Sequence, residues 1–170
     1  MTVSAAPPSP LPHPSAGRFI DRVHELDVRV YYEDTDFTGV VYHANYLRYF
    51  ERGRSDFLRL AGIGHAELWA RPDPLAFVVG DIRVRYGAPA QVDDALVVRT
   101  LYQTIRGARL EIDQTLVRGS SVLAEAKIIA ACVNAEGRPR RAPQDLLTLL
   151  SPYLEQRSRG SSPPRVLKSS

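Results

Sequence analysis

The strongest constraint on the fold of this chain is one amphipathic helical pattern in its first half. From Asn45 to Ala61 apolar side chains recur at helical spacing, and Gly62 stands where a C-capping glycine belongs. Gly53 lies within this apolar face, at a cost of about 1 kcal/mol relative to alanine, which makes sense where a helix backbone passes close to a sheet. The pattern therefore predicts one long helix packed against strands. Its predicted buried face consists of Tyr46, Tyr49, Phe50, Gly53, Phe57, Leu60 and Ala61.

Strand patterns surround this helix. Apolar and polar residues alternate from Glu25 to Tyr32, which predicts a strand with one buried face. Four further runs of strand character follow the helix and are joined by turn signals, some short enough for antiparallel hairpins. These runs are Phe77–Tyr86, Leu96–Ile105, Arg109–Val117 and Val122–Val133, and Pro143 could open a final short helix.

This order of elements predicts an α+β domain in which one curved antiparallel five-stranded sheet wraps around the central long helix. A single sheet around a single helix leaves edge strands and one sheet face uncovered. We therefore expect a homo-oligomer, a dimer or tetramer, in which a second copy continues the sheet.

Composition bounds the domain count and the compartment. The chain has 170 residues, enough for one domain, which we place at residues 24–153. Residues 1–23 are rich in proline, and residues 154–170 are polar and basic, so both segments are predicted to be disordered. Much of the +3 charge lies in that C-terminal tail, and the domain lacks a basic run, which argues against nucleic-acid binding. The single cysteine, Cys132, and the lack of a secretory signal or membrane-spanning pattern predict a cytoplasmic protein.

The segment from Tyr31 to Arg59 concentrates the residues suited to chemistry. Asp34 and Asp36 precede a glycine-bearing turn, and His43 follows it beside the start of the predicted helix. A carboxylate, an imidazole and the electropositive amides of a helix N-terminus together suit acyl transfer to water. Asp, Thr and Gly are also ordinary turn and capping residues, so spacing alone leaves a purely structural role open.

A thioester carbonyl is already electrophilic, so a catalyst has to polarise its oxygen and deliver an oxygen nucleophile. Helix N-terminal amides would do the first. Asp36 would do the second, either by direct attack that forms a mixed anhydride or as a general base on water. His43 would orient the thioester or assist the leaving thiolate. Neither route needs a metal or a cofactor.

The segment YYEDTDFTGVVYHANYLRYFERGRSDFLR and the order of elements closely resemble the hotdog-fold acyl-CoA thioesterases. Within them, the resemblance is to the Tol-Pal-associated (YbgC-like) branch of the 4-hydroxybenzoyl-CoA thioesterase family. It covers about residues 26–150 and includes the downstream motifs Tyr86-x-x-Pro89-Ala90-x-x-Asp93-Asp94-x-Leu96 and Gly137-Arg138-Pro139. The resemblance implies a hotdog fold and the hydrolysis of an acyl-CoA to a free acid and coenzyme A.

The resemblance also implies roles for single residues. Asp36 would be the catalytic carboxylate, His43 the other side chain of the site, and Asp34 the supporting acid. The backbone N–H of His43 would point at the thioester carbonyl, in a site between subunits. Phe37 departs from the small residue that family members often carry there, and it could reshape the acyl entrance.

Two other functions fit the same residues. A hotdog dehydratase or hydratase acting on an acyl-carrier thioester would use His43 as the main acid–base group and Asp36 as its partner. A non-catalytic module that binds acyl groups or acyl carrier protein for the envelope Tol-Pal system is suggested by the resemblance alone.

Two further sets of charged residues have a structural and a functional interpretation. Glu51 lies on the predicted helix, and other hotdog branches place a helical glutamate in the catalytic role, but its spacing from neighbouring arginines favours a charge pattern on the helix. A small basic cluster fits either the phosphates of coenzyme A or a solvated turn. This cluster consists of Arg138, Arg140 and Arg141.

Overall fold

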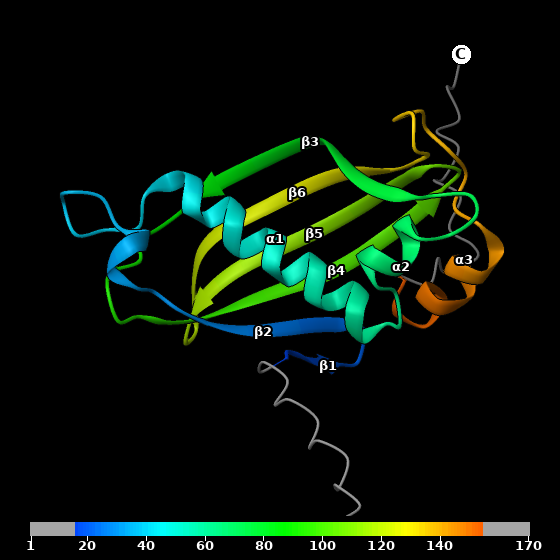
Figure 1. The fold of residues 1–170 in the computed structure, drawn as a ribbon. Helices are drawn as coiled ribbons and strands as arrows, with labels where there is room; N and C mark the ends of the chain where they lie inside the picture. Colours follow the sequence, from blue (N-terminus) through cyan, green and yellow to red (C-terminus); the bar gives the residue numbers. More distant parts are fainter. Residues whose placement is uncertain (1–15, 155–170) are drawn as a thin grey trace, which may run out of the picture.

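One long helix lies across one face of a single antiparallel sheet in the computed structural model of the protein, which describes residues 16–154 (Figure 1). The elements are β1 (Arg18–Ile20), β2 (Val23–Arg29), η1 (Tyr32–Asp34), α1 (His43–Leu60), α2 (His65–Trp69), β3 (Ala76–Tyr86), β4 (Ala95–Arg106), β5 (Arg109–Arg118), β6 (Ser121–Val133), α3 (Gln144–Leu150) and η2 (Ser151–Tyr153). The strand order is β1-β2-β4-β5-β6-β3. The predicted α+β architecture, an antiparallel sheet with a central helix, is confirmed.

The sheet has six strands rather than the five expected, because β1 pairs with the outer edge of β2. The sequence predicts disorder through residue 23, and this is wrong from Arg18 onward. Phe19 stacks on Tyr153 with ring centroids 4.1 Å apart, and the N–H of Gly17 donates to the carboxylate of Asp56 at 2.7 Å. These contacts join residues that are far apart in the chain, so the local sequence pattern does not predict them. The remainder of both predicted tails, residues 1–15 and 155–170, lies outside the described residues.

The strand expected over Glu25–Tyr32 is β2, and it ends three residues early, at Arg29. Asp34 turns the chain away from the sheet. Its carboxylate accepts the N–H of Tyr31 at 2.8 Å, and its own N–H donates to the carbonyl of Tyr31 at 3.0 Å. The tyrosines at the end of the alternating pattern are consequently exposed. Helix α1 then begins at His43, two residues before the expected start.

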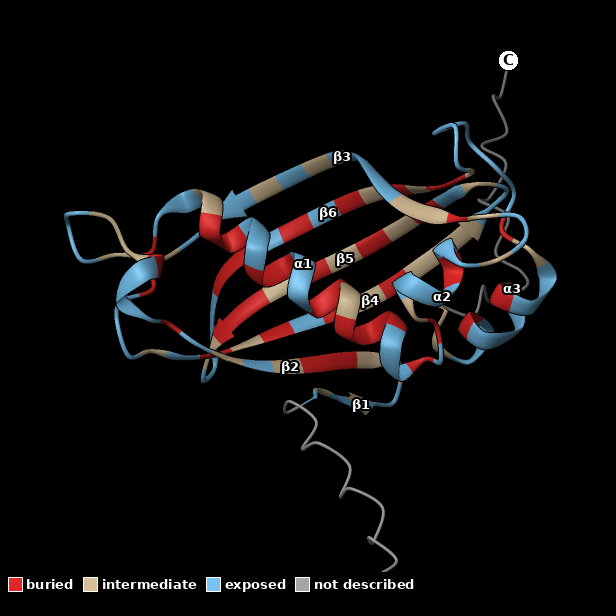
Figure 2. Ribbon diagram, viewed as in Figure 1, coloured by how far each residue is buried: buried red, intermediate tan, exposed pale blue. Residues whose placement is uncertain are grey.

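The core fills the space between α1 and the sheet (Figure 2). Tyr49, Phe50 and Phe57 are fully buried, as the helical pattern predicts. Leu60 is the exception in the predicted face, since it is 39% exposed while Leu58 is 2% exposed. The reason is tertiary: Leu58 lines a small cavity that is shared with residues of α2 and β3, and Leu60 is not among the residues that line it.

Gly53 sets how closely α1 approaches the sheet. A Cβ atom at this position would lie 2.7 Å from Cγ1 of Val98 on β4 and 2.9 Å from Oγ1 of Thr100. The predicted close approach of the helix backbone to strands is thus confirmed. Gly62 has a φ of +84°, and the next N–H, of Ile63, donates to the carbonyl of Leu58 at 2.8 Å, which terminates the helix as expected.

Strand β3 forms one edge of the sheet, and the short strand β1 forms the other. Val78 and Val79 on β3 are each 45% exposed, so this long edge carries apolar side chains. Between residues 16 and 154, no helix has the length and apolarity that crossing a bilayer requires. The expected oligomer and the cytoplasmic location both stay predictions.

Candidate active site

Asp36 lies on the loop between η1 and α1, and this loop holds its carboxylate in place. The N–H of Asp36 donates to the carbonyl of Val40 at 3.0 Å, and the N–H of Gly39 donates back at 3.1 Å, which closes a tight turn with a φ of +81° at the glycine. Oδ1 of Asp36 accepts the hydroxyl of Thr38 at 2.5 Å and its backbone N–H at 2.8 Å. These hydrogen bonds, that of the hydroxyl foremost, lower the pKa of Asp36. The carboxylate is therefore ionised at neutral pH, and its second oxygen has no hydrogen-bond partner among residues 16–154.

Asp34 is buried and has a different surrounding. Its carboxylate accepts the Tyr31 N–H, and its carbonyl oxygen accepts the N–H of Tyr42 at 2.9 Å and the side-chain amide of Asn45 at 2.7 Å. Asp34 thus ties the loop to the first turn of α1 through side chain and backbone together. Burial, followed by the nearby Asp34 carboxylate, also raises the pKa of Tyr49.

The start of α1 presents free backbone amides beside this loop. His43 is the first helical residue, and no acceptor for its N–H or for that of Ala44 is found within the described part of the chain. Tyr86, at the end of β3, donates its hydroxyl to the carbonyl of His43 at 3.0 Å and so holds the first turn against the sheet. Two such N–H groups can donate hydrogen bonds that stabilise a developing negative charge on a carbonyl oxygen.

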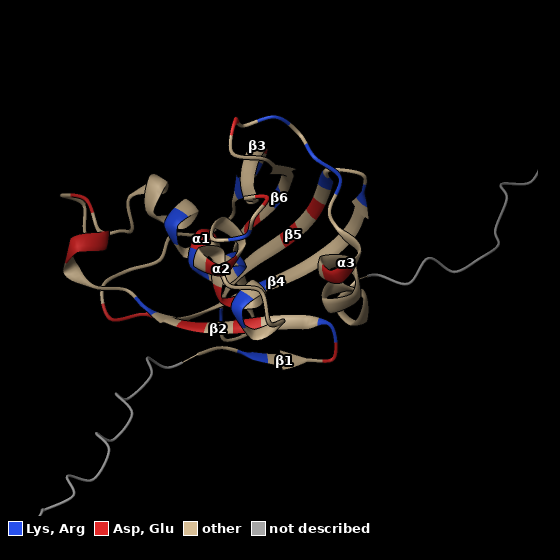
Figure 3. Cartoon of the chain, turned by 45° about the vertical axis from the view of Figure 1, so that its right-hand side comes forward, with Lys and Arg blue, Asp and Glu red and all other residues tan. Residues whose placement is uncertain are grey.

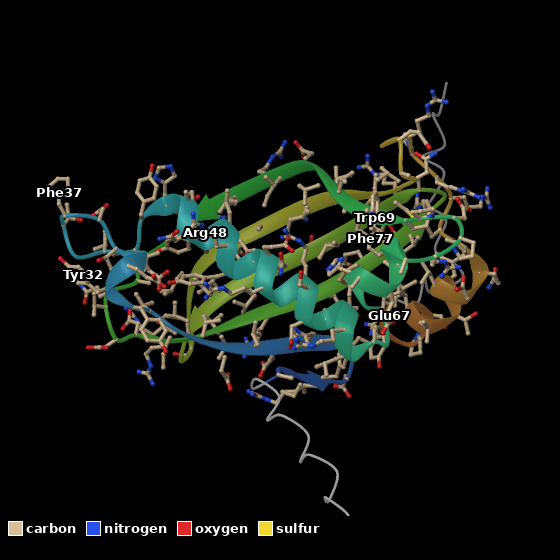
Figure 4. All side chains as sticks on the ribbon, in the orientation of Figure 1. Tyr32, Phe37, Arg48, Glu67, Trp69 and Phe77 are labelled. Carbon is tan, nitrogen blue, oxygen red and sulfur yellow. The ribbon has the colours of Figure 1, made fainter. Side chains whose placement is uncertain are left out.

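The imidazole of His43 is exposed and lies between aromatic rings. The ring of Tyr42 is 4.5 Å away and that of Tyr86 is 6.5 Å away, centroid to centroid. No hydrogen bond joins His43 to Asp36 among residues 16–154, so the structure places the two on the same loop-and-helix junction without a direct link. Phe37 is fully exposed at the tip of the loop and points away from the domain, as does Tyr32 (Figure 4).

The sequence pattern does not indicate the contacts of two further residues at this junction. Tyr86 belongs to a quoted motif, but its partner on α1 is 43 positions away, so only the fold reveals the contact. The pattern predicts Asn45 only as a helix start, whereas its side-chain amide donates to the carbonyl of Asp34. In the described residues, no three His, Cys, Asp or Glu side chains gather as metal ligands would.

The other charged groups fall elsewhere. Glu51 pairs with Arg54 at 2.5 Å and accepts the hydroxyl of Ser55 at 2.7 Å, which matches a charge pattern along α1. The basic cluster of residues 138–141 follows β6, whose end pairs with the beginning of β3, whereas the end of β3 contacts the site. The cluster therefore lies at the opposite end of the sheet from Asp36 in the same subunit.

Comparison with known proteins places the chain in a family. The thioesterase-like superfamily matches residues 30–150, which is more than half of the sequence. The chain belongs to this superfamily. The thioesterase-like match includes the whole Asp36 loop and α1, while β1 and β2 precede it. The resemblance to the hotdog thioesterases is thereby confirmed.

Individual thioesterase-like relatives agree with this assignment. The acyl-CoA thioesterase YbgC of Haemophilus influenzae is 41% identical over 115 residues, which cover 68% of this chain and 84% of that protein. The acyl-CoA thioester hydrolase YbgC of Escherichia coli is 40% identical over 122 residues, covering 71% and 90% respectively. Among solved structures, a probable thioesterase from Bartonella henselae aligns with a TM-score of 0.69 at 44% identity, over 71% of this chain and 99% of that one.

Proposed function

We propose that this thioesterase-like protein hydrolyses the thioester of an acyl-CoA to a free acid and coenzyme A, with Asp36 as nucleophile or general base. The observation that carries the proposal is the pairing of an ionised, hydrogen-bonded carboxylate with free amides at the start of α1. The names of the YbgC relatives support the substrate class.

In this mechanism the thioester oxygen accepts hydrogen bonds from the N–H groups of His43 and Ala44. Removing one such donor typically costs about 3 to 4 kcal/mol of transition-state stabilisation. The free oxygen of Asp36 either attacks the carbonyl carbon or takes a proton from the attacking water. The C–S bond then breaks, the leaving thiolate takes up a proton, and hydrolysis of any anhydride returns Asp36 to its carboxylate form. The imidazole of His43 is the exposed group available to the thiolate.

We also propose that the site is completed by a second copy of the chain. The edge strand β3 carries exposed Val78 and Val79, and Phe37 and Tyr32 leave an exposed aromatic surface beside Asp36. Exposed apolar groups of this kind mark interfaces. Antiparallel pairing of two β3 strands about a two-fold axis would put the basic cluster of one subunit beside the Asp36 loop of the other. That cluster, Arg138, Arg140 and Arg141, would then meet the phosphates of coenzyme A.

Free-thiol release from a panel of acyl-CoAs, from short aliphatic through aromatic to long-chain, tests the reaction. Asp36→Asn should lower kcat by about 100- to 10,000-fold, because it removes the nucleophile or base. The amide oxygen can still accept both hydrogen bonds of Thr38, so the variant should stay folded by circular dichroism. Glu33→Gln is the matched control, since Glu33 is an exposed carboxylate three residues away and should be replaceable without loss.

Three outcomes would contradict the proposal. Turnover that survives Asp36→Asn would remove the assigned role of this carboxylate. Retained hydration of an enoyl thioester by the same variant would favour the hydratase alternative with His43 as acid–base group. Tight thioester or acyl-carrier-protein binding without any turnover would favour the binding module, and with it the expected Tol-Pal link.

Mixing inactive variants tests the shared site separately. A dimer of Asp36→Asn with a subunit that carries both Arg138→Ala and Arg141→Ala contains one intact site. Co-refolding the two at equal amounts should therefore restore roughly one quarter of the wild-type rate if subunits pair at random. A mixture no more active than its components would mean that each site is built within one subunit.

A further inference from the structure

A groove lies between β2 and α1, apart from the candidate active site. It has a volume of about 750 Å³, within the range usual for small-molecule sites. Neither Asp36 nor His43 lines it. We call it the β2–α1 groove. The lining residues that matter here are Leu26, Val28, Arg29, Arg52, Arg59 and Ile63.

The two carboxylates of the groove are already engaged by other groups. Asp27 accepts the guanidinium of Arg18 at 3.0 Å. Asp56 is hydrogen-bonded to the buried His24 at 2.8 Å and is ion-paired with Arg59. Figure 3 shows Lys and Arg positions along α1 and beside the acidic positions of β2. Three arginines against two occupied carboxylates leave the groove with a net positive charge.

Arg52 is the cation best placed for a new partner. Its guanidinium carbon lies 5.8 Å from the centroid of the Tyr49 ring, and no carboxylate pairs with it in the part of the chain that the structure describes. Among residues 16–154, the hydrogen bond found for the Arg29 side chain goes to a backbone carbonyl, that of Asp93, at 2.7 Å. A guanidinium can bind a carboxylate through two parallel hydrogen bonds. Arg52 is therefore suited to bind the carboxylate of a ligand in this groove.

The apolar side chains of the β2–α1 groove determine which class of anion fits it. Leu26 and Val28 on β2 are only partly buried and pack against the core beneath α1, and Ile63 also lines the groove. A phosphate or a nucleotide would leave these side chains uncovered. An aliphatic chain would bury them and gain free energy from each methylene group.

We propose that the β2–α1 groove binds an amphipathic anion, a long-chain carboxylate whose chain lies on Leu26 and Val28 and whose head group pairs with Arg52. The ligand class follows from the charge and the apolar floor of the groove. It does not depend on the reaction proposed above, although acyl-CoA hydrolysis would release acids of this class.

Isothermal titration of the full chain with tetradecanoate, kept below its aggregation concentration, tests the proposal. We expect saturable binding, one ligand per chain, that Arg52→Gln weakens by roughly tenfold or more. Val28→Thr, which keeps the side-chain shape but replaces a methyl group by a hydroxyl, should weaken it too. Arg48→Gln is the matched control, because Arg48 is an exposed arginine one turn earlier on α1 and does not line the groove (Figure 4).

Two further ligands separate the contributions of the carboxylate head group and the aliphatic chain to binding. Butanoate, which has the head without the chain, and dodecyltrimethylammonium, which has a chain with the opposite charge, should each bind at least roughly tenfold more weakly. Absence of saturable binding would overturn the proposal. So would binding that Arg52→Gln leaves unchanged, because Arg52 would then not pair with the head group. Displacement by a non-hydrolysable acyl-CoA analogue would overturn it as well, because the carboxylate would then lie in the Asp36 site. Binding is measured without turnover, so a chain that binds tetradecanoate but hydrolyses no acyl-CoA would contradict the proposed reaction alone.

Discussion

Replacing Gly53 by alanine should destabilise the protein, although alanine is the better helix former. The added Cβ would lie 2.7 Å from Val98 Cγ1, 2.9 Å from Thr100 Oγ1 and 3.1 Å from Gln114 Nε2. All three neighbours are almost completely buried. Ordinary contact begins near 3.4 Å, so α1 or β4 would have to move by about 0.7 Å at the closest point.

The expected size of the effect follows from three terms. Forcing an extra carbon into a packed core costs about 1 to 3 kcal/mol. Disturbing the 2.8 Å hydrogen bond between Gln114 and Thr100 costs about 1 kcal/mol more, and the helix propensity of alanine returns about 1 kcal/mol. The free energy of unfolding should therefore fall by about 1 to 3 kcal/mol. Because α1 also carries the His43 amide, its displacement should lower kcat as well.

Urea unfolding, followed by circular dichroism, measures this loss. Val98→Ala removes the atom nearest to the new Cβ, so it serves as the second arm of a double-mutant cycle. The double variant should be more stable than the sum of the single effects predicts, by about 1 kcal/mol. A Gly53→Ala protein as stable as the wild type, or strict additivity in the cycle, would refute the claim that this glycine sets the distance from helix to sheet.

Three further predictions concern the site and the core. Thr38→Val removes the hydroxyl that contributes most to the lowered pKa of Asp36, so the acidic limb of the kcat/KM profile should move to higher pH, while Thr38→Ser should leave it in place. Tyr86→Phe deletes the hydrogen bond to the His43 carbonyl and should lower kcat about two- to tenfold with little change in KM, and an unchanged kcat would deny Tyr86 a positioning role. Burial lowers the pKa of His24 from 6.5 to about 4, so the unfolded chain binds more protons than the folded one between these pH values. The free energy of unfolding, measured by urea titration, should therefore fall as the pH drops from 6.5 to about 4. This dependence on pH should be weaker in His24→Gln.

Much of the fold follows from local pattern. The repeat along α1 and the glycine after it mark one helix, and Gly53 reports that the helix touches a sheet, because a glycine there makes sense only under close packing. The hairpin turns carry glycines with positive φ, Gly107 and Gly119, so the strands they join are also readable from the sequence.

Contacts between residues that are distant in the chain cannot be predicted from the local sequence pattern. Whether Leu58 or Leu60 is buried depends on α2 and β3, which cover one flank of the helix. The candidate active site also combines local contacts with contacts between distant residues. The bond between Asp36 and Thr38 spans two residues and is typical of a turn, whereas the hold of Tyr86 on the first helical turn requires the sheet to be in place.

The two ends of the described chain close on each other through aromatic rings. Phe19 stacks on Tyr153 and meets Phe57 edge-on at 5.0 Å, while Arg22 donates to the carbonyl of Leu154 at 3.1 Å. Chain ends are usually the first parts of a domain to open. Here neither end should open alone, because unfolding of either end would expose the aromatic ring at the other end to solvent. The first and last elements of this domain should therefore exchange their amide hydrogens together, in the same cooperative step as the helix they cover.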